Sequence, residues 1–107
     1  MSGYYSFTIS DGSLKKELSS IQFAFTHKSV LSRNVNNADS TVTVDLTDFT
    51  TIKDILITST KEIILTVNGA AIPITNFLFM EISSLTSLTV ACSDVTGSEV
   101  EIIIWGS

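Results

Sequence analysis

The sequence predicts an all-β domain, an antiparallel β-sandwich of about eight strands with a jelly-roll-like arrangement. Thr, Val and Ile make up about a third of the 107 residues, and a pleated, half-buried surface favours these residue types. Short runs of alternating polar and apolar residues recur along the chain, separated by polar turns. Asn68-Gly69 stands between two such runs and indicates a hairpin turn in which both residues adopt positive φ. No linker or repeat interrupts the pattern, so we expect a single domain over residues 1–107.

The first 40 residues contain two strand patterns and two segments without one. Residues 4–9 and 21–26 alternate strictly, which predicts a strand for each, the second with its Ile and two Phe side chains facing inward. Residues 13–20 carry two leucines four positions apart and fit either one or two helical turns or a loop. Residues 27–40 lack periodicity, which predicts a surface loop.

Five further strands are expected between residues 41 and 82. Each is an alternating or continuous apolar run bounded by polar turns. One of them contains Pro73, the only proline, and should lie at a sheet edge or begin at a bulge because proline cannot donate to a ladder. Phe49 is expected to be tucked beneath a connection. The expected strands are residues 41–46, 53–59, 62–67, 70–74 and 76–82.

The last two strands, residues 85–92 and 99–105, are expected to pair as a hairpin. Cys92 is the only cysteine, and its place on the apolar side predicts a buried structural thiol. The opposite side of the last strand carries Ile103 and Trp105 beside two glutamates, more apolar surface than solvent normally favours. The side chains expected to match across the buried face are Leu88, Val90 and Cys92 with Val100, Ile102 and Ile104.

Composition argues against several classes of partner. Charged residues are only 16% of the chain, and 16 Ser and 14 Thr supply most of the polar surface; low charge favours surfaces that pack against other chains. The net charge is −5 and no Lys or Arg follows Lys61, so no nucleic-acid partner is expected. We also expect no membrane partner and synthesis in a cytoplasm, because the chain shows neither a run of ~20 apolar residues nor a signal peptide.

Few residues could carry catalysis or bind a metal. The chain has one histidine, His27, and one cysteine, whereas a structural zinc site needs about four such ligands. Three aspartates between residues 39 and 48 lack the spacing of a calcium loop. Glu99 and Glu101 share one strand face, roughly 7 Å apart, and are interpreted as charges that protect a sheet edge. We therefore expect no catalytic residue, no enzyme activity, no metal and no cofactor.

Six segments carry a resemblance to a known class of protein: Asp45–Ser59, Ile64–Gly69, Ile72–Ile74, Phe77–Met80, Leu85–Val90 and Val100–Gly106. In these segments the chain resembles small β-sandwich or jelly-roll virion structural proteins of tailed bacteriophages, of the head-decoration, collar or fibre type. The resemblance implies location in the virion, a homo-oligomer with a trimer favoured, and contacts with other virion proteins. Residues 1–40 would then be either a segment that attaches the subunit to the particle or a peripheral segment.

Two functions are therefore expected, one from each of two classes. The first is a virion structural protein that acts by self-assembly and attachment, with Ile103 and Trp105 at the subunit contact. The alternative is a carbohydrate- or receptor-binding module that presents Tyr4, Tyr5 and Trp105 to a glycan of the host surface. These three aromatic residues lie near the two ends of the chain, which often approach each other in β-sandwiches.

Overall fold

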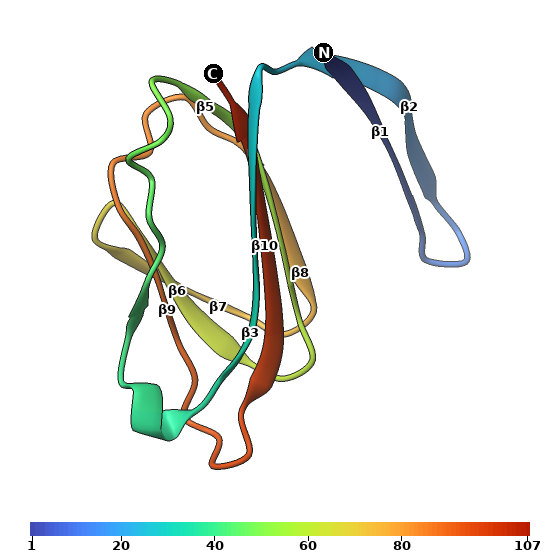
Figure 1. The fold of residues 1–107 in the computed structure, drawn as a ribbon. Coiled ribbons are helices and arrows are strands. Elements are labelled where there is room, and N and C mark those ends of the chain that lie inside the picture. Colours follow the sequence, from blue (N-terminus) through green and yellow to red (C-terminus); the bar gives the residue numbers. More distant parts are fainter.

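The computed structural model describes all residues, 1–107, as ten strands and one short 3₁₀ helix. Eight strands form two four-stranded sheets that face each other, and the remaining two form a separate hairpin (Figure 1). All pairings are antiparallel, which confirms the all-β antiparallel class. The elements are β1 (Ser2–Ser10), β2 (Lys15–Ala24), β3 (His27–Val35), η1 (Asn37–Asp39), β4 (Val42–Thr43), β5 (Ile52–Ser59), β6 (Ile63–Val67), β7 (Ala70–Ile74), β8 (Phe77–Glu81), β9 (Leu88–Ala91) and β10 (Ser98–Gly106).

The eight strands of the two facing sheets pair in a nested way. The first sheet has the order β3-β10-β5-β8 and the second has the order β4-β9-β6-β7. The first of these eight strands therefore pairs with the last, β4 with β9, β5 with β8, and β6 with β7 as the innermost hairpin. Apart from β6 and β7, consecutive strands of the sandwich thus lie on opposite sheets, and most contacts join distant parts of the chain.

The core lies between the two sheets and is aliphatic. It contains 15 buried residues, none of them aromatic. Ile57 and Ile102 face inward from the first sheet, and Leu65 and Leu88 face inward from the second; each is at most 1% exposed. Removing such side chains from water contributes about 1.5–3 kcal/mol each. Cys92 is buried in the same cluster, as the sequence predicts.

Several local predictions in the middle of the chain are confirmed. Asn68 and Gly69 have φ of 50° and 86° and connect β6 to β7. The Asn68 carboxamide also accepts the backbone N–H of Thr86 at 2.7 Å, so the turn is tied to the next loop. Pro73 lies on β7, an edge strand of the second sheet. Phe49 packs against the core from a connection.

The prediction of a helix or loop for residues 13–20 is wrong, because most of that segment belongs to β2. The strand pairs with β1 along its length, which supplies the backbone partners that an isolated segment lacks. The alternation is interrupted where Ser20 has a φ of 51° and donates its N–H to the Ser6 hydroxyl at 2.9 Å. This irregularity shifts the register of the pair, and it hides the strand pattern in the sequence.

The prediction of a loop for residues 27–40 is also wrong over most of its length. β3 is an edge strand of the first sheet, and it pairs with β10 from His27 to Val35. Its outward side carries polar residues such as Lys28 and Ser32, so the sequence shows little apolar periodicity. In the next segment, regular pairing is limited to two residues of β4, although Val44 beyond it is buried.

The expected hairpin between the last two strands is not formed. β9 belongs to the second sheet and β10 to the first, so their apolar sides face each other across the core instead of sharing one face. The connection between them turns at Asp94, whose carboxylate accepts the N–H groups of Thr96 and Gly97. Because β10 is flanked by β3 and β5, Glu99 and Glu101 lie mid-sheet and do not protect an edge.

Candidate functional site

The two strands outside the sandwich form the N-terminal hairpin, residues 2–24, whose backbone is hydrogen-bonded to the rest of the chain at its base. The Phe25 N–H donates to the Met1 carbonyl at 2.9 Å, and the Thr26 N–H donates to the Gly106 carbonyl at 2.8 Å. From this base the hairpin extends away from the first sheet, with its tip free (Figure 1). Because an isolated two-stranded hairpin is at best marginally stable in water, its other contacts determine how it is held.

Three aromatic pairs connect the hairpin to the first sheet. The ring centroids lie 5.5 Å apart for Phe23 and Trp105 and 4.6 Å apart for Tyr5 and Phe79. A third pair, 6.3 Å apart, joins the hairpin to β8 further from the base. Such pairs contribute about 0.5–1.5 kcal/mol beyond the area they bury. Gly3 leaves room for this packing, since a Cβ at that position would lie 2.7 Å from the Phe23 ring.

The outer face of the first sheet carries an apolar row, here called the outer stripe, formed by Val30, Ile103, Leu56 and Phe79. These residues are direct neighbours across β3, β10, β5 and β8 in the register of the sheet. Val30 remains 54% exposed at the β3 end, whereas the hairpin covers the β8 end. The hairpin therefore shields only part of the outer stripe.

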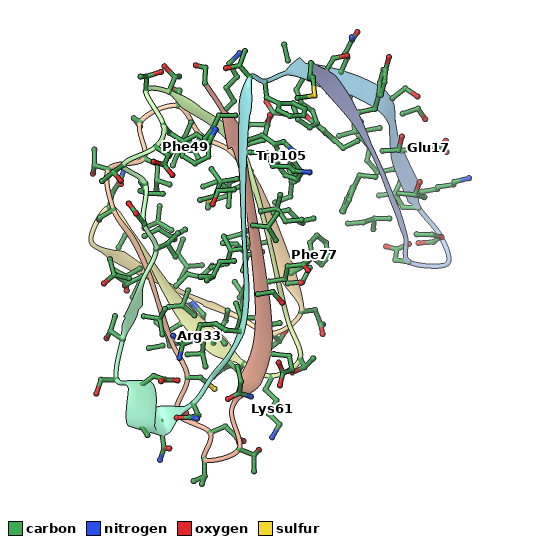
Figure 2. All side chains as sticks on the ribbon, in the orientation of Figure 1. Glu17, Arg33, Phe49, Lys61, Phe77 and Trp105 are labelled. Atoms are coloured by element: carbon green, nitrogen blue, oxygen red, sulfur yellow. The ribbon has the colours of Figure 1, made fainter.

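An apolar groove of about 670 Å³ lies between the hairpin and the outer face of the first sheet. Figure 2 shows Trp105 and Phe77 on the side of the sandwich that faces the hairpin. Seven of the nine aromatic residues of the chain line this groove, and the buried core contains none. The aromatic surface of this protein is thus concentrated at one accessible site, here called the aromatic groove. Its aromatic residues are Tyr4, Tyr5, Phe7, Phe23, Phe77, Phe79 and Trp105.

Two carboxylates lie at the base of the hairpin, where it meets the first sheet. Asp54 on β5 and Glu81 on β8 are direct cross-strand neighbours, and Asp54 is only 4% exposed. Burial, followed by the charge of Glu81, raises the pKa of Asp54, whereas Lys53 lowers it. The Tyr5 hydroxyl donates to the Glu81 carboxylate. This bond, followed by desolvation, raises the pKa of Tyr5 to about 12.

A second hollow, of about 620 Å³, has a different character. It lies among the loops that follow β4 and precede β9, and Ser and Thr residues make up much of its lining. Asp45 is its only carboxylate, and hydrogen bonds from the Thr47 hydroxyl and N–H lower the Asp45 pKa. No group of three or more His, Cys, Asp or Glu residues that could hold a metal ion occurs in the structure.

The structure places all the residues selected from the sequence at the aromatic groove or beside it. Tyr4, Tyr5 and Trp105 line it together; Tyr4 is 67% exposed, and the other two are half-buried. Trp105 lies against Phe23, so part of its ring is already covered within the chain. Ile103 lies half-buried in the middle of the outer stripe.

Sequence reasoning missed the contribution of β8 and assigned Phe23 to the core. Phe77 and Phe79 alternate with Leu78 and Met80, so both sides of this strand are apolar. A strand that is apolar on both sides must be covered on both, and this was the available signal for a second packing layer. The apolar side of residues 21–25 carries the same signal, but the sequence does not say which sheet it covers.

The fold and the groove together define an antiparallel β-sandwich protein with an apolar, aromatic groove under a projecting hairpin. Comparison with family models, with curated proteins and with solved structures found no match to this chain. No helix in the structure has the length and apolar character that crossing a bilayer requires.

Proposed function

We propose that this chain is a structural protein of a bacteriophage virion, of the capsid-decoration, head-fibre or tail and collar type. It acts without catalysis, by assembling with copies of itself and attaching to other virion proteins. The observation that carries this proposal is the aromatic groove: aromatic side chains are enriched in protein interfaces, and here they lie outside the core.

The pairing of the strands supports a jelly-roll assignment for the sandwich. In a jelly roll, eight strands wrap as nested antiparallel pairs into two facing sheets, an architecture common in viral capsid and lectin domains. Strands β3 to β10 pair in that nested order, with β6 and β7 as the innermost hairpin. The resemblance of Asp45–Gly106 to tailed-phage virion proteins favours a viral structural role over a lectin role.

The outer stripe supports self-assembly as the mode of action. A subunit contact needs apolar residues that neighbouring side chains of the same chain do not already cover. Val30 is 54% exposed and Phe77 is 51% exposed, on either side of the half-buried Ile103. Low overall charge adds little electrostatic repulsion between copies at this face. We place the subunit contact here, around Ile103 and Trp105, and a trimer remains the favoured assembly.

Absolute molar mass in solution, measured by light scattering after size exclusion, tests this function. The wild-type chain should have a mass above its monomer value of 11.6 kDa, and Ile103→Ser should shift the population toward the monomer. Ile64→Ser is the matched control, because Ile64 is 37% exposed on the outer face of the second sheet. A wild-type chain that stays monomeric at all concentrations would contradict self-assembly, and equal effects of the two substitutions would contradict the assigned face.

A carbohydrate- or receptor-binding module is the second candidate, and one observation favours it. Tyr4, Tyr5 and Trp105 line one groove, and Tyr4 is largely exposed within it. The Glu81 carboxylate, which lines the same groove, would accept hydrogen bonds from sugar hydroxyls. Binding on a glycan array that is lost in Tyr4→Ala would support this module, whereas an array without signal from a folded sample would contradict it.

A further inference from the structure

We infer that the uncovered part of the aromatic groove and outer stripe receives the tip of the N-terminal hairpin from a second copy of this chain. The inference rests on the proposed self-assembly, and it names both the segment that one copy donates and the surface that the other provides. Four features of the hairpin and the sheet support it.

The hairpin is divided into a base that packs on its own sheet and a tip that does not. Tyr5 and Phe23 at the base contact Phe79 and Trp105. The apolar residues nearest the tip remain uncovered: Ile9 is 54% exposed and Leu14 is 70% exposed. With these residues in solvent, the tip of the hairpin is stabilised only by its own ladder.

The receiving surface is also left incomplete within one chain. Val30 marks the β3 end of the outer stripe, on the opposite edge of the sheet from β8, where the hairpin of the same chain packs. The tip of that hairpin points away from the sheet (Figure 1), so it does not cover Val30 in its own chain. A hairpin from another copy is a segment of matching apolar character that could lie over this end of the stripe.

The distribution of charge favours a hairpin as the occupant. Residues 1–26 carry two basic and two acidic side chains, whereas residues 27–107 carry four basic and nine acidic ones. A hairpin without net charge therefore meets less electrostatic repulsion at this face than a second sandwich would. Both basic residues of the hairpin, Lys15 and Lys16, lie next to its tip.

The acidic partners for these lysines lie beside the outer stripe. Glu101 and Glu99 lie two and four residues before Ile103, on the same face of β10. Both glutamates are exposed. In the chain itself Lys15 contacts only Glu17, at 3.5 Å, with both side chains largely in solvent. A hairpin tip placed on the Val30 end of the stripe with its Ile9 side against the sheet brings Lys16, the cross-strand neighbour of Ile9, toward these glutamates.

Charge reversal tests the pairing. Lys15→Glu with Lys16→Glu should weaken self-association by roughly tenfold, and Glu99→Lys with Glu101→Lys should do the same. A sample that combines all four substitutions should regain the wild-type association, because the attractive pairs are restored with opposite signs. Concentration-dependent light scattering gives all of these dissociation constants. If both reversals leave association unchanged, or if the combined variant is no better than either pair, the inference is overturned.

Cross-linking tests whether the contact is between chains. A chain with Ile9→Cys mixed with a chain with Val30→Cys should give a heterodimer on addition of a short thiol-reactive cross-linker. The native Cys92 is buried and should not react. A chain carrying both substitutions that cross-links only within itself, at high and low concentration, would show that the hairpin closes over its own sheet and would overturn the inference.

The outcomes separate this inference from the proposed function. A wild-type chain that is monomeric at every concentration contradicts both. A wild-type oligomer that is insensitive to the charge reversals and gives no Ile9–Val30 product leaves self-assembly intact and contradicts only the exchange of hairpins. Binding of a different protein or of a glycan to the groove of a monomer would likewise overturn the exchange.

Discussion

Asp54 and Glu81 face each other across β5 and β8, with the hairpin residue Tyr5 hydrogen-bonded to Glu81. Two like charges opposite each other on neighbouring strands are destabilising. Here one of them, Asp54, is also almost fully buried. The tyrosine hydroxyl stabilises the Glu81 carboxylate, but no hydrogen bond compensates the Asp54 side chain. At the base of the hairpin, ionisation of Asp54 therefore opposes the packing of the hairpin against the first sheet.

Asp54→Asn should raise the free energy of unfolding at pH 7. The folded state raises the pKa of Asp54 above its unfolded value of about 3.9, so the ionised form costs stability above the folded pKa. Below the unfolded pKa the carboxyl is protonated in both states and the cost disappears. The gain from the substitution should therefore shrink as the pH falls from the raised folded pKa toward about 4, and it should be absent at lower pH. Urea denaturation of wild type and Asp54→Asn at pH 7 and below pH 4 measures this gain. An Asp54→Asn midpoint equal to or below that of wild type at pH 7 would contradict the prediction.

Asp94→Asn should have the opposite pH dependence. Hydrogen bonds from the Thr96 hydroxyl, from Lys61 and from the Thr96 and Gly97 N–H groups lower the pKa of Asp94 to about 2. The ionised carboxylate thus stabilises the fold above its unfolded pKa of about 3.9, and this contribution is lost as the pH falls toward 2. Denaturation midpoints of wild type and variant should differ at pH 6 and converge near pH 2. A constant difference across this range would argue against ionisation as its source.

Ser98→Ala should destabilise the sandwich by about 1–3 kcal/mol, because it removes the side-chain acceptor of the Lys61 N–H and one of the two acceptors of the Thr60 N–H, the other being the Glu99 carbonyl. The fully buried Ser98 hydroxyl accepts the N–H groups of Thr60 at 3.1 Å and Lys61 at 3.0 Å, and it donates to the Lys61 carbonyl. It thus holds the turn between β5 and β6 against β10. Ser93→Ala is the control, since Ser93 is exposed. Chemical denaturation should show a lower free energy of unfolding for Ser98→Ala and an unchanged one for Ser93→Ala.

Gly97→Ala should be more destabilising than Gly69→Ala. Both glycines have positive φ, 83° and 86°, so both substitutions carry the same backbone cost of about 1–2 kcal/mol. A Cβ at Gly97 would also lie 2.8 Å from the Val35 carbonyl and would clash with Asn34, whereas nothing lies within 4 Å at Gly69. Overpacking should add about 1–3 kcal/mol to the destabilisation caused by Gly97→Ala. Thermal denaturation of the two variants gives the comparison, and equal melting temperatures would refute it.

Phe23→Ala should loosen the hairpin without unfolding the sandwich. Its ring joins Trp105 to the aromatic cluster, and no residue of the hairpin belongs to the buried core. Amide hydrogen exchange should therefore accelerate across residues 2–24, while the amides of β5 and β10 keep their protection. Tyr4→Ala is the control, because Tyr4 is 67% exposed. Uniform acceleration over the whole chain would mean that the hairpin and the sandwich unfold together.

Most strands of the sandwich could be predicted from the sequence because one side of each is buried and the other is not. This holds for residues 53–59 and 62–67, whose bounds differ by one residue from β5 and β6. Pairing could not be predicted in the same way. Strands that follow each other usually pair, which led to the wrong hairpin between β9 and β10, where the connection crosses from one sheet to the other.

The aromatic groove was only partly predictable. Ile103 and Trp105 stand out because they are apolar on the outer side of a strand, and they lie on the outer stripe and in the groove respectively. The hairpin could not be identified because its strand pattern is broken at Ser20. Its position over the first sheet depends on contacts between residues far apart in sequence, such as Phe23 and Trp105, and local patterns do not contain that information.

The position of β10 between β3 and β5 has a consequence for how the protein is made. β3 ends at Val35, yet its pairing partner is complete only at Gly106. At synthesis rates of about 5–20 residues per second, several seconds pass between the synthesis of β3 and the synthesis of β10. During that time its backbone is unpaired and can pair with a neighbouring nascent chain. Pairing of β3 with β10 therefore cannot be completed before translation reaches residue 106, and a pause before residue 98 would lengthen the interval in which chains can misassociate.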